Sequence, residues 1–202
     1  MIHIKKDIKL LNSREKPYPH DYVVCRLFLW IFPQSVKPNH ITIFRMLATP
    51  FVFLFVIRED WLIAAPVFLI IAFTDVLDGT MARMRKQVTA WGTLFDPVAD
   101  KFLIGGVLFI LILEYVNILI GMAIISLELL VIIGGWLKKH HGTIISASRW
   151  GKTKMVLQVL GIGMILLSLL LNNSDTMLIA EWTLILSIGF ALLNIFNKGL
   201  SL

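Results

Sequence analysis

Long apolar segments recur along this sequence, and they constrain its fold more than any other feature. A helix needs about 20 mostly apolar residues to cross the hydrocarbon core of a membrane. Hydrophobic residues make up 57% of the 202 residues and charged residues 16%, whereas soluble domains average about 45–50% and about 25%. We therefore expect an all-α integral membrane protein with six transmembrane helices. The expected spans are His40–Ile57, Trp61–Ala82, Leu94–Glu114, Ile118–Leu137, Met155–Leu171 and Met177–Phe196.

Lysine and arginine are unevenly distributed between the segments that connect these spans. The stretch before the first span, the second-to-third loop and the fourth-to-fifth loop are rich in both, whereas the three opposite connections contain only Arg58. Because cytoplasmic loops carry the excess of positive charge, we expect both termini on the cytoplasmic side of the plasma membrane. We therefore attribute the formal charge of +6 to the positively charged cytoplasmic loops, and we expect no nucleic acid as a partner.

Residues 1–39 are expected to form a cytoplasmic segment, and residues 40–202 a six-helix membrane domain. Within the first segment, Tyr22–Phe32 is apolar except for Arg26, and Pro33 follows it. A helix of this length reaches about 16 Å, roughly half the hydrocarbon thickness. We therefore expect an amphipathic helix that lies along the membrane interface. The alternative is a short helix that packs on the bundle and has no contact with lipid.

Four aspartates lie inside two neighbouring spans. Asp75 and Asp78 are three residues apart in the second span, and Asp96 and Asp100 are four apart in the third. Each pair therefore shares one face of a helix. Because the two spans are antiparallel, both pairs are expected at similar depth, just inside the cytoplasmic boundary. The sequence thus predicts that four carboxylates converge on one small volume.

Charged groups inside a membrane are costly and mark functional sites by default. Four clustered carboxylates repel one another and favour protonation unless cations compensate them. Two divalent cations would balance the four negative charges, and oxygen ligands suit Mg²⁺ or Mn²⁺. Two metal ions bound side by side are a recurrent feature of enzymes that catalyse displacement at phosphorus. The alternatives are a proton or cation path of a transporter, and aspartates that cap helices at the interface.

Small and basic residues accompany the aspartates of the second span. Gly79 and Ala82 leave a hollow on the aspartate face, and Arg83 lies one turn further along. A guanidinium group offers two parallel donors to a phosphate. This segment is therefore predicted to bind a phosphorylated ligand beside the carboxylates.

The stretch from Asp75 to Asp100 resembles the signature of the CDP-alcohol phosphatidyltransferases, D-x2-D-G-x2-A-R-x8-G-x3-D-x3-D, at every fixed position. The resemblance implies six membrane helices with an interfacial N-terminal helix, assembled as a homodimer. It also implies that an alcohol hydroxyl attacks the β-phosphorus of a CDP-linked lipid such as CDP-diacylglycerol and that CMP is released. By position, Asp75, Asp78 and Asp96 would ligate metal, and Asp100 would ligate the second ion and act as general base.

The same resemblance implies which residues contact the CDP-linked lipid. Pro38-Asn39-His40-Ile41-Thr42 resembles the P-N-x-x-T turn of the family, and the other expected contacts lie at matching positions within or near the signature. For Thr89, a loop threonine without a ligand is the alternative. The expected contacts are Asn39, Thr42, Gly79, Ala82, Arg83 and Thr89.

Two further stretches point to the acceptor. Phe95–Lys101 resembles the L-D-P-x-A-D-K segment of phosphatidylglycerophosphate synthases and of CMP-forming cardiolipin synthases, and Ser148–Gln158 resembles a G-K-x-K-T-x-x-Q segment of the former. A basic cluster suits a small anionic acceptor such as glycerol 3-phosphate. The alternatives are positive charge placed there by topology alone, and another acceptor such as phosphatidylglycerol. The residues expected to bind the acceptor phosphate are Lys101, Arg149, Lys152 and Lys154.

One position departs from those synthases. They often carry an Arg-Glu pair in the fourth span, where this chain has Leu127-Glu128. Glu128 is then expected either to meet a basic partner such as Lys101 or to stay protonated. The missing arginine bears on the choice of acceptor and leaves the predicted chemistry unchanged.

Overall fold

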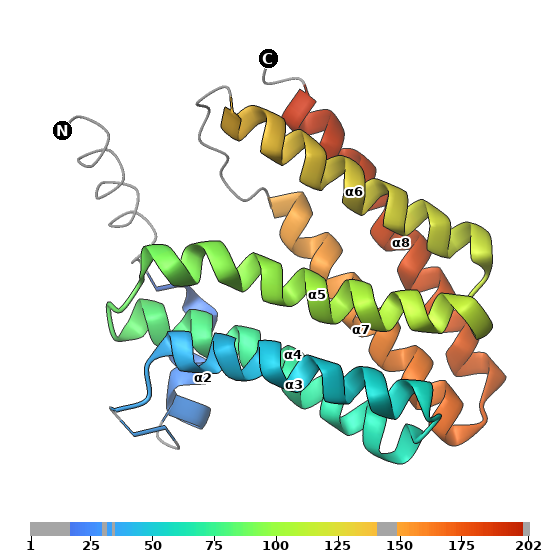
Figure 1. Ribbon diagram of the computed structural model, residues 1–202, viewed down its shortest axis with the longest axis horizontal. Coiled ribbons are helices and arrows are strands. Elements are labelled where there is room, and N and C mark those ends of the chain that lie inside the picture. Colours follow the sequence, from blue (N-terminus) through green and yellow to red (C-terminus); the bar gives the residue numbers. More distant parts are fainter. Residues whose placement is uncertain (1–16, 30–31, 34, 141–148, 200–202) are drawn as a thin grey trace. The chain divides into compact units, whose positions relative to one another are not determined.

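The computed structural model describes residues 17–29, 32–33, 35–140 and 149–199. Within these ranges the chain forms seven helices and no strand, so the fold is all helical, as the sequence predicts. The helices, labelled as in Figure 1, are α2 (Pro19–Phe28), α3 (Pro38–Ile57), α4 (Trp61–Met84), α5 (Ala90–Glu114), α6 (Ile118–His140), α7 (Arg149–Leu171) and α8 (Ser174–Gly199).

Each of the six predicted spans lies within one of the helices α3–α8, and several of these helices extend beyond the apolar segment. For example, α5 begins at Ala90, before the expected Leu94. The Thr89 hydroxyl accepts a hydrogen bond from the Gly92 N–H (3.0 Å). Because such a bond satisfies a free donor of the first turn, Thr89 caps α5 and fixes where it starts.

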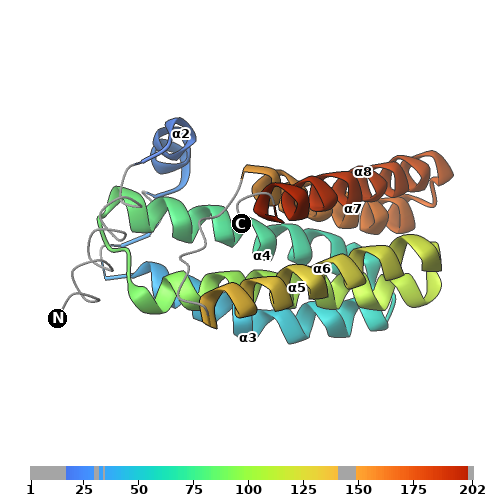
Figure 2. The same cartoon turned by 90° about the horizontal axis from the view of Figure 1, so that it is seen from above.

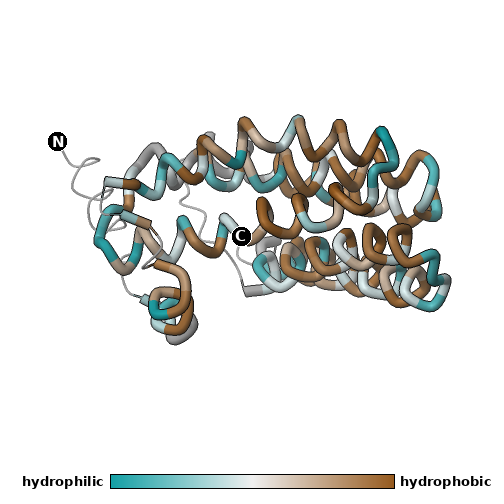
Figure 3. Tube along the Cα trace, turned by 90° about the horizontal axis from the view of Figure 1, so that it is seen from below, coloured by the Kyte–Doolittle hydropathy of each residue, from teal (hydrophilic) through white to brown (hydrophobic). Residues whose placement is uncertain are grey.

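Among the described residues, four helices are long and apolar enough to cross a membrane: α3, α4, and the larger parts of α7 and α8. Many of their large apolar side chains point outward, and Leu47, Leu62 and Trp182 are each more than 60% exposed. Helices that are apolar on all sides are typical of a membrane environment. Figure 3 shows hydrophobic residues along the helices and most hydrophilic residues near their ends. The chain is therefore a membrane protein.

The helices divide between two compact units, and the division cuts three of them. Unit 1 comprises residues 1–52 and 66–103, with α2, most of α3 and α4, and the first half of α5. Unit 2 comprises residues 53–65 and 104–202, with the α3–α4 turn, the rest of α5, and α6, α7 and α8. Within unit 1, hydrogen bonds join α3 to α4 and α5. Within unit 2, α7 and α8 lie side by side, and α8 also contacts α6 (Figures 1 and 2).

The predicted bounds of the N-terminal helix are wrong. The apolar run predicts a helix over Tyr22–Phe32, whereas α2 runs from Pro19 to Phe28; residues 30 and 31 lie outside the described part of the chain. A proline in the first turn favours a helix start there. The Asp21 carboxylate also accepts a hydrogen bond from the Tyr18 N–H (2.7 Å), which caps the helix. The start was missed because the first turn of α2 is polar.

Several glycines in unit 2, Gly106 and Gly161 among them, allow a neighbouring side chain to approach a helix closely. A Cβ at Gly106 of α5 would lie 2.2 Å from the Phe53 ring of α3, and one at Gly161 of α7 would lie 2.7 Å from Leu184 of α8. Both distances are far shorter than a normal contact, so each glycine provides room for its neighbour. Gly105 differs, since a Cβ there would have no described atom within 4 Å.

We expect Gly106→Ala to lower the midpoint of thermal unfolding of the detergent-solubilised protein. The added methyl group forces the Phe53 ring to move, and overpacking of this kind costs about 1–3 kcal/mol. The matched control is Gly105→Ala, one residue away on the same helix, where the methyl group meets open space. Both variants gain the same helix propensity, so the difference between their midpoints isolates the contact with Phe53. Equal midpoints would contradict the close approach.

Candidate active site

The four predicted aspartates lie in unit 1, where they meet a residue of α3. Asp75 and Asp78 lie on α4, and Asp96 and Asp100 on α5. Nη1 of Arg45 lies 3.1 Å from Asp75 Oδ1 and also pairs with Asp100 Oδ1. Nη2 of Arg45 pairs with Asp78 Oδ2. One guanidinium group therefore contacts three of the four carboxylates, from both helices that carry them.

Thr42 connects the fourth carboxylate to the others. Its hydroxyl donates to Asp96 Oδ1 (2.8 Å) and lies 3.3 Å from Asp78 Oδ2. Thr42 and Arg45 are three residues apart on α3 and therefore share a face of the helix. This face thus contacts aspartates of both α4 and α5, and the structure brings all four carboxylates into one polar network.

Asn39 and Thr89 meet at the start of α5. The Thr89 hydroxyl donates to Asn39 Oδ1 (2.9 Å). A Cβ at Gly92 would lie 3.1 Å from Asn39 Oδ1 and 3.5 Å from Asp96 Oδ2, so the missing side chain leaves space for both. Three predicted nucleotide contacts, Asn39, Thr42 and Thr89, are therefore grouped beside Asp96. Thr89 is the N-cap of α5, a role that neither sequence alternative foresaw.

The carboxylates carry more negative charge than Arg45 balances. The Arg45 side chain is fully buried and that of Asp78 is 2% exposed, whereas that of Asp75 is 37% exposed. One guanidinium offsets one of four negative charges, and buried charges need partners. The buried Asp78 Oδ1 has no hydrogen-bond partner in the part of the chain that the structure describes. Further cations or protons are therefore needed here.

The chemistry of these ligands suits a hard divalent cation, because they are carboxylate oxygens and one of them, Asp78 Oδ1, is buried and unpaired. Among the described residues, however, no three acidic, histidine or cysteine side chains are placed to hold one ion. Arg45 lies among three of the carboxylates instead. An ion that binds here would have to displace the guanidinium from part of its contacts.

Arg83, the predicted phosphate ligand, already binds an aspartate of α2. Its Nε and Nη2 each donate to Asp21 at 2.7 Å, and the Thr80 hydroxyl donates to Asp21 Oδ1 (2.8 Å). The Asp21 side chain is fully buried, whereas that of Arg83 is 21% exposed. Gly79 lies beside the guanidinium group, and Ala82 precedes Arg83 on α4 and is half-buried.

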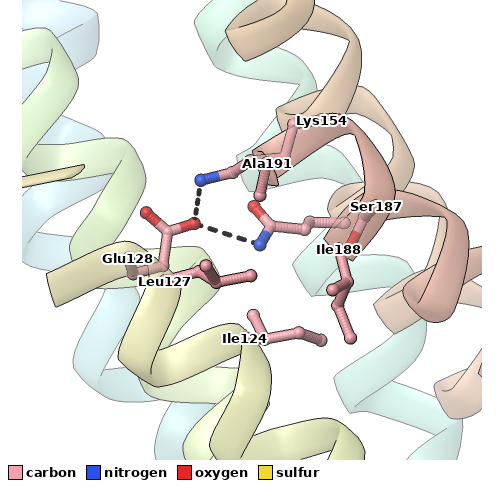
Figure 4. Close-up of a pocket in the computed structure, with 8 residues that line it drawn as sticks. Ile124, Leu127, Glu128, Lys154, Ser187, Ile188 and Ala191 are labelled. Carbon is pink, nitrogen blue, oxygen red and sulfur yellow. Dashed lines mark hydrogen bonds and ion pairs between the residues drawn. The ribbon is translucent and has the colours of Figure 1, made fainter. Parts of the chain in front are cut away.

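In unit 2, the carboxylate of Glu128 on α6 has two partners on α7. Lys154 pairs with Glu128 Oε1, and Gln158 Nε2 donates to the same oxygen (3.0 Å). Figure 4 shows Glu128 and Lys154 pointing toward each other in a small pocket that α8 also lines. A basic partner was one of the two outcomes expected from the sequence. The basic partner is Lys154, whereas the example that the sequence offered was Lys101.

The residues predicted to bind the acceptor phosphate differ in their surroundings. Lys154 is buried, whereas Lys152, two residues earlier on α7, is exposed. Residues two apart on a helix do not face the same side, which explains the difference. Lys101 follows Asp100 on α5 and is exposed. Arg149 begins α7, but its side chain lies outside the described residues.

Sequence reasoning missed two residues of the site, Arg45 and Asp21. Arg45 stands among apolar residues of a predicted span, so the rule that intramembrane charge marks function applies to it as well. Arg45 also follows Thr42 by three residues, and Thr42 follows Asn39 by three. This helical spacing from two predicted site residues is a second sequence signal that pointed to Arg45. Asp21 gives no local signal, because its partner Arg83 is 62 positions away.

A family model described as CDP-alcohol phosphatidyltransferase matches residues 35–193, which include the four aspartates. The match covers well over half of the chain. Members of this family generally use divalent metal ions.

Three relatives are each named CDP-diacylglycerol–glycerol-3-phosphate 3-phosphatidyltransferase. That of Pseudomonas fluorescens is 42% identical over 84 residues, which are 40% of this chain and 43% of the relative. That of Haemophilus influenzae is 34% identical over 135 residues, 62% of this chain and 72% of the relative. That of Rickettsia felis is 32% identical over 137 residues, which are 64% of this chain and 74% of the relative. The match thus spans less than half of the first relative and most of the other two.

We expect Arg45→Gln to destabilise the protein, because removing one partner of a buried ion pair costs about 3–5 kcal/mol. The loss should be largest in EDTA and smaller with Mg²⁺, since a divalent cation can offset the carboxylate charge that Arg45 leaves. The measurement is the midpoint of thermal unfolding in both buffers. The control, Arg58→Gln, removes the same charge from an exposed turn. An Arg45→Gln midpoint in EDTA no lower than that of the control would contradict this role.

Proposed function

Since the chain belongs to the CDP-alcohol phosphatidyltransferase family, we propose that it transfers a phosphatidyl group from CDP-diacylglycerol to glycerol 3-phosphate. The products would be phosphatidylglycerophosphate and CMP. Family membership makes the chain an enzyme and argues against the cation or proton transporter considered from the sequence. The donor and the acceptor are proposed from the names of the relatives.

One observation carries this proposal: the carboxylates of α4 and α5 meet at a single polar face of α3, formed by Thr42 and Arg45. Transfer at a diphosphate requires positive charge near the phosphate oxygens. It also requires a group that takes the proton of the attacking hydroxyl. A cluster of carboxylates can serve both needs, because it can hold cations and accept a proton.

In the proposed reaction, the acceptor hydroxyl oxygen forms a bond to the β-phosphorus of CDP-diacylglycerol, and the bond from this phosphorus to the oxygen of CMP breaks. We assign Asp100 as the base that takes the hydroxyl proton. The family resemblance supports this assignment, and the Asp100 side chain is 12% exposed, so it is not fully closed off from a substrate. Because Arg45 pairs with Asp100, this contact has to loosen before the proton is accepted.

The aspartates would also hold the divalent ions that the family uses. Such ions supply positive charge at the diphosphate. The proposed ligands of two Mg²⁺ or Mn²⁺ ions are Asp75, Asp78, Asp96 and Asp100. The proposed contacts of the CDP-linked lipid are Asn39, Thr42, Gly79, Ala82, Arg83 and Thr89.

We further propose six membrane crossings, which adds α5 and α6 to the four helices identified by length and composition. The Lys- and Arg-rich connections would then lie in the cytoplasm. The aspartates, near the end of α4 and the start of α5, would lie at the inner leaflet of the plasma membrane. There a lipid headgroup and a water-soluble acceptor can meet. A homodimer is proposed from the family resemblance.

The proposed activity can be tested with an acceptor panel. Purified protein with CDP-diacylglycerol and Mg²⁺ should release CMP with glycerol 3-phosphate, and mass spectrometry should identify phosphatidylglycerophosphate. Glycerol is the matched control, because it lacks only the phosphate group. A preference for phosphatidylglycerol would overturn the proposed acceptor and leave the transferase chemistry in place. No CMP release with any alcohol would overturn the proposed function.

We expect Asp100→Asn to lower the rate of CMP release by at least about 100-fold, because general base catalysis typically contributes 10²–10⁴-fold. The amide keeps the size of the side chain but cannot accept the proton. Thermal unfolding of the variant should show that it is folded. Asp175→Asn, an exposed position in the first turn of α8, is the control and should retain activity. Full turnover by Asp100→Asn would remove this residue as the base.

A further inference from the structure

Asp21 of α2 receives four hydrogen bonds, although α2 precedes the predicted spans. Its Oδ1 accepts from Arg83 Nη2 (2.7 Å) and from the Thr80 hydroxyl (2.8 Å). Its Oδ2 accepts from Arg83 Nε (2.7 Å) and from the Tyr18 backbone N–H (2.7 Å). Burial alone would raise the pKa of Asp21, but these hydrogen bonds outweigh it and lower the pKa to about 2. The carboxylate therefore stays charged at any physiological pH.

These bonds fix one edge of the Arg83 guanidinium group. Nε and Nη2 form a two-point contact with Asp21, and such a contact sets both the plane and the direction of the group. The guanidinium carbon also lies over the Tyr18 ring, 5.2 Å from its centroid. The third nitrogen, Nη1, lies 3.2 Å from the position that a Cβ of Gly79 would occupy. Asp21 therefore determines where Nη1 points.

Nη1 lies on the face of α4 that leads to the aspartates. Asp75, Gly79 and Arg83 follow one another at intervals of four residues and so share one helix face. Because Nη1 lies over Gly79, it is on the side of Arg83 that is nearer to Asp75. Gly79 has no side chain to fill this space, and Arg83 is partly exposed. A diphosphate group held at the aspartates would therefore find a fixed donor beside it.

On the basis of the function proposed above, we infer that Asp21 is a positioning residue that orients Arg83 toward the diphosphate of the CDP-linked donor lipid. Without Asp21, the long arginine side chain would sample many rotamers, and ordering it upon binding would weaken the affinity. The inference gives α2 a part in substrate binding through Arg83. It differs from a mere attachment of α2 to α4, which the same contacts could also provide.

The test is Asp21→Asn, which removes the charge that orients Arg83 and keeps the size of the side chain. We measure the Kd for CDP-diacylglycerol by thermal-shift titration of the purified protein without any acceptor. We expect the Kd to rise about tenfold, as for the loss of a hydrogen bond to a charged group. The kcat at saturating donor should change much less. Asp21→Glu, which keeps the charge, should recover part of the affinity; a Kd equal to that of wild type in Asp21→Asn would overturn the inference.

Phe28→Leu is the matched control for the attachment of α2. The Phe28 ring contacts the Phe73 ring of α4 edge-on, with centroids 5.1 Å apart. This variant loosens the contact of α2 with α4 at a place that does not involve Arg83. If Phe28→Leu raises the Kd as much as Asp21→Asn does, Asp21 acts only by anchoring α2 and the inference is overturned.

Two further variants, Arg83→Gln and its combination with Asp21→Asn, test whether Asp21 acts through Arg83. If it does, Asp21→Asn combined with Arg83→Gln should bind the donor no more weakly than Arg83→Gln alone, whereas additive losses would overturn the inference.

If Asp21→Asn does not fold, Gly79→Ala replaces it, because the new methyl group presses on Nη1 of Arg83. An unchanged Kd in Gly79→Ala would overturn the inference.

Failure of the proposed function can be told apart from failure of this inference. Wild-type protein that does not bind CDP-diacylglycerol would overturn the proposed function. Wild-type protein that binds it, together with variants of Asp21 that bind it equally well, would overturn only the positioning role.

Discussion

Carboxylates packed among apolar helices cannot all stay charged without cations beside them, and this requirement governs the arrangement of unit 1. Arg45 meets part of it by contacting three of the four aspartates, and Thr42 donates to the fourth, Asp96. One face of α3 therefore serves as the polar wall of the site, although most residues of this helix are apolar. The charge that Arg45 leaves uncompensated gives the site its proposed affinity for divalent cations.

The helices were predictable because a membrane leaves the backbone little choice. An apolar segment of about 20 residues has to be helical to satisfy its N–H and C=O groups in hydrocarbon, and all six predicted segments lie in helices. Their ends were less predictable, because caps are polar contacts that an apolar run does not reveal. Thr89 starts α5 before its apolar run, and Pro19 and Asp21 start α2 before the run that begins at Tyr22.

The aspartates were predictable from their spacing, but their partners were not. Spacing along one helix shows which residues share a face, and this placed Asp75 with Asp78. It does not show which residue of another helix lies opposite. The contacts of Asp21 and Arg45 therefore required the three-dimensional structure. Glu128 illustrates the same limit, since the sequence left open whether it is protonated or meets a basic partner and did not select Lys154.

Two arginines of unit 1, Arg45 and Arg83, show how surroundings give one type of side chain two different roles. Arg45 is fully buried and contacts three carboxylates, so its N–H donors stabilise negative charges of the protein's own side chains. Arg83 pairs with the Asp21 carboxylate along one edge and is 21% exposed. A guanidinium group with one fixed edge and an accessible remainder is suited to bind an anion. Lysine would not replace either residue, because an ammonium group cannot make the two-point contact with Asp21 or reach from Asp75 to Asp78 as one planar group.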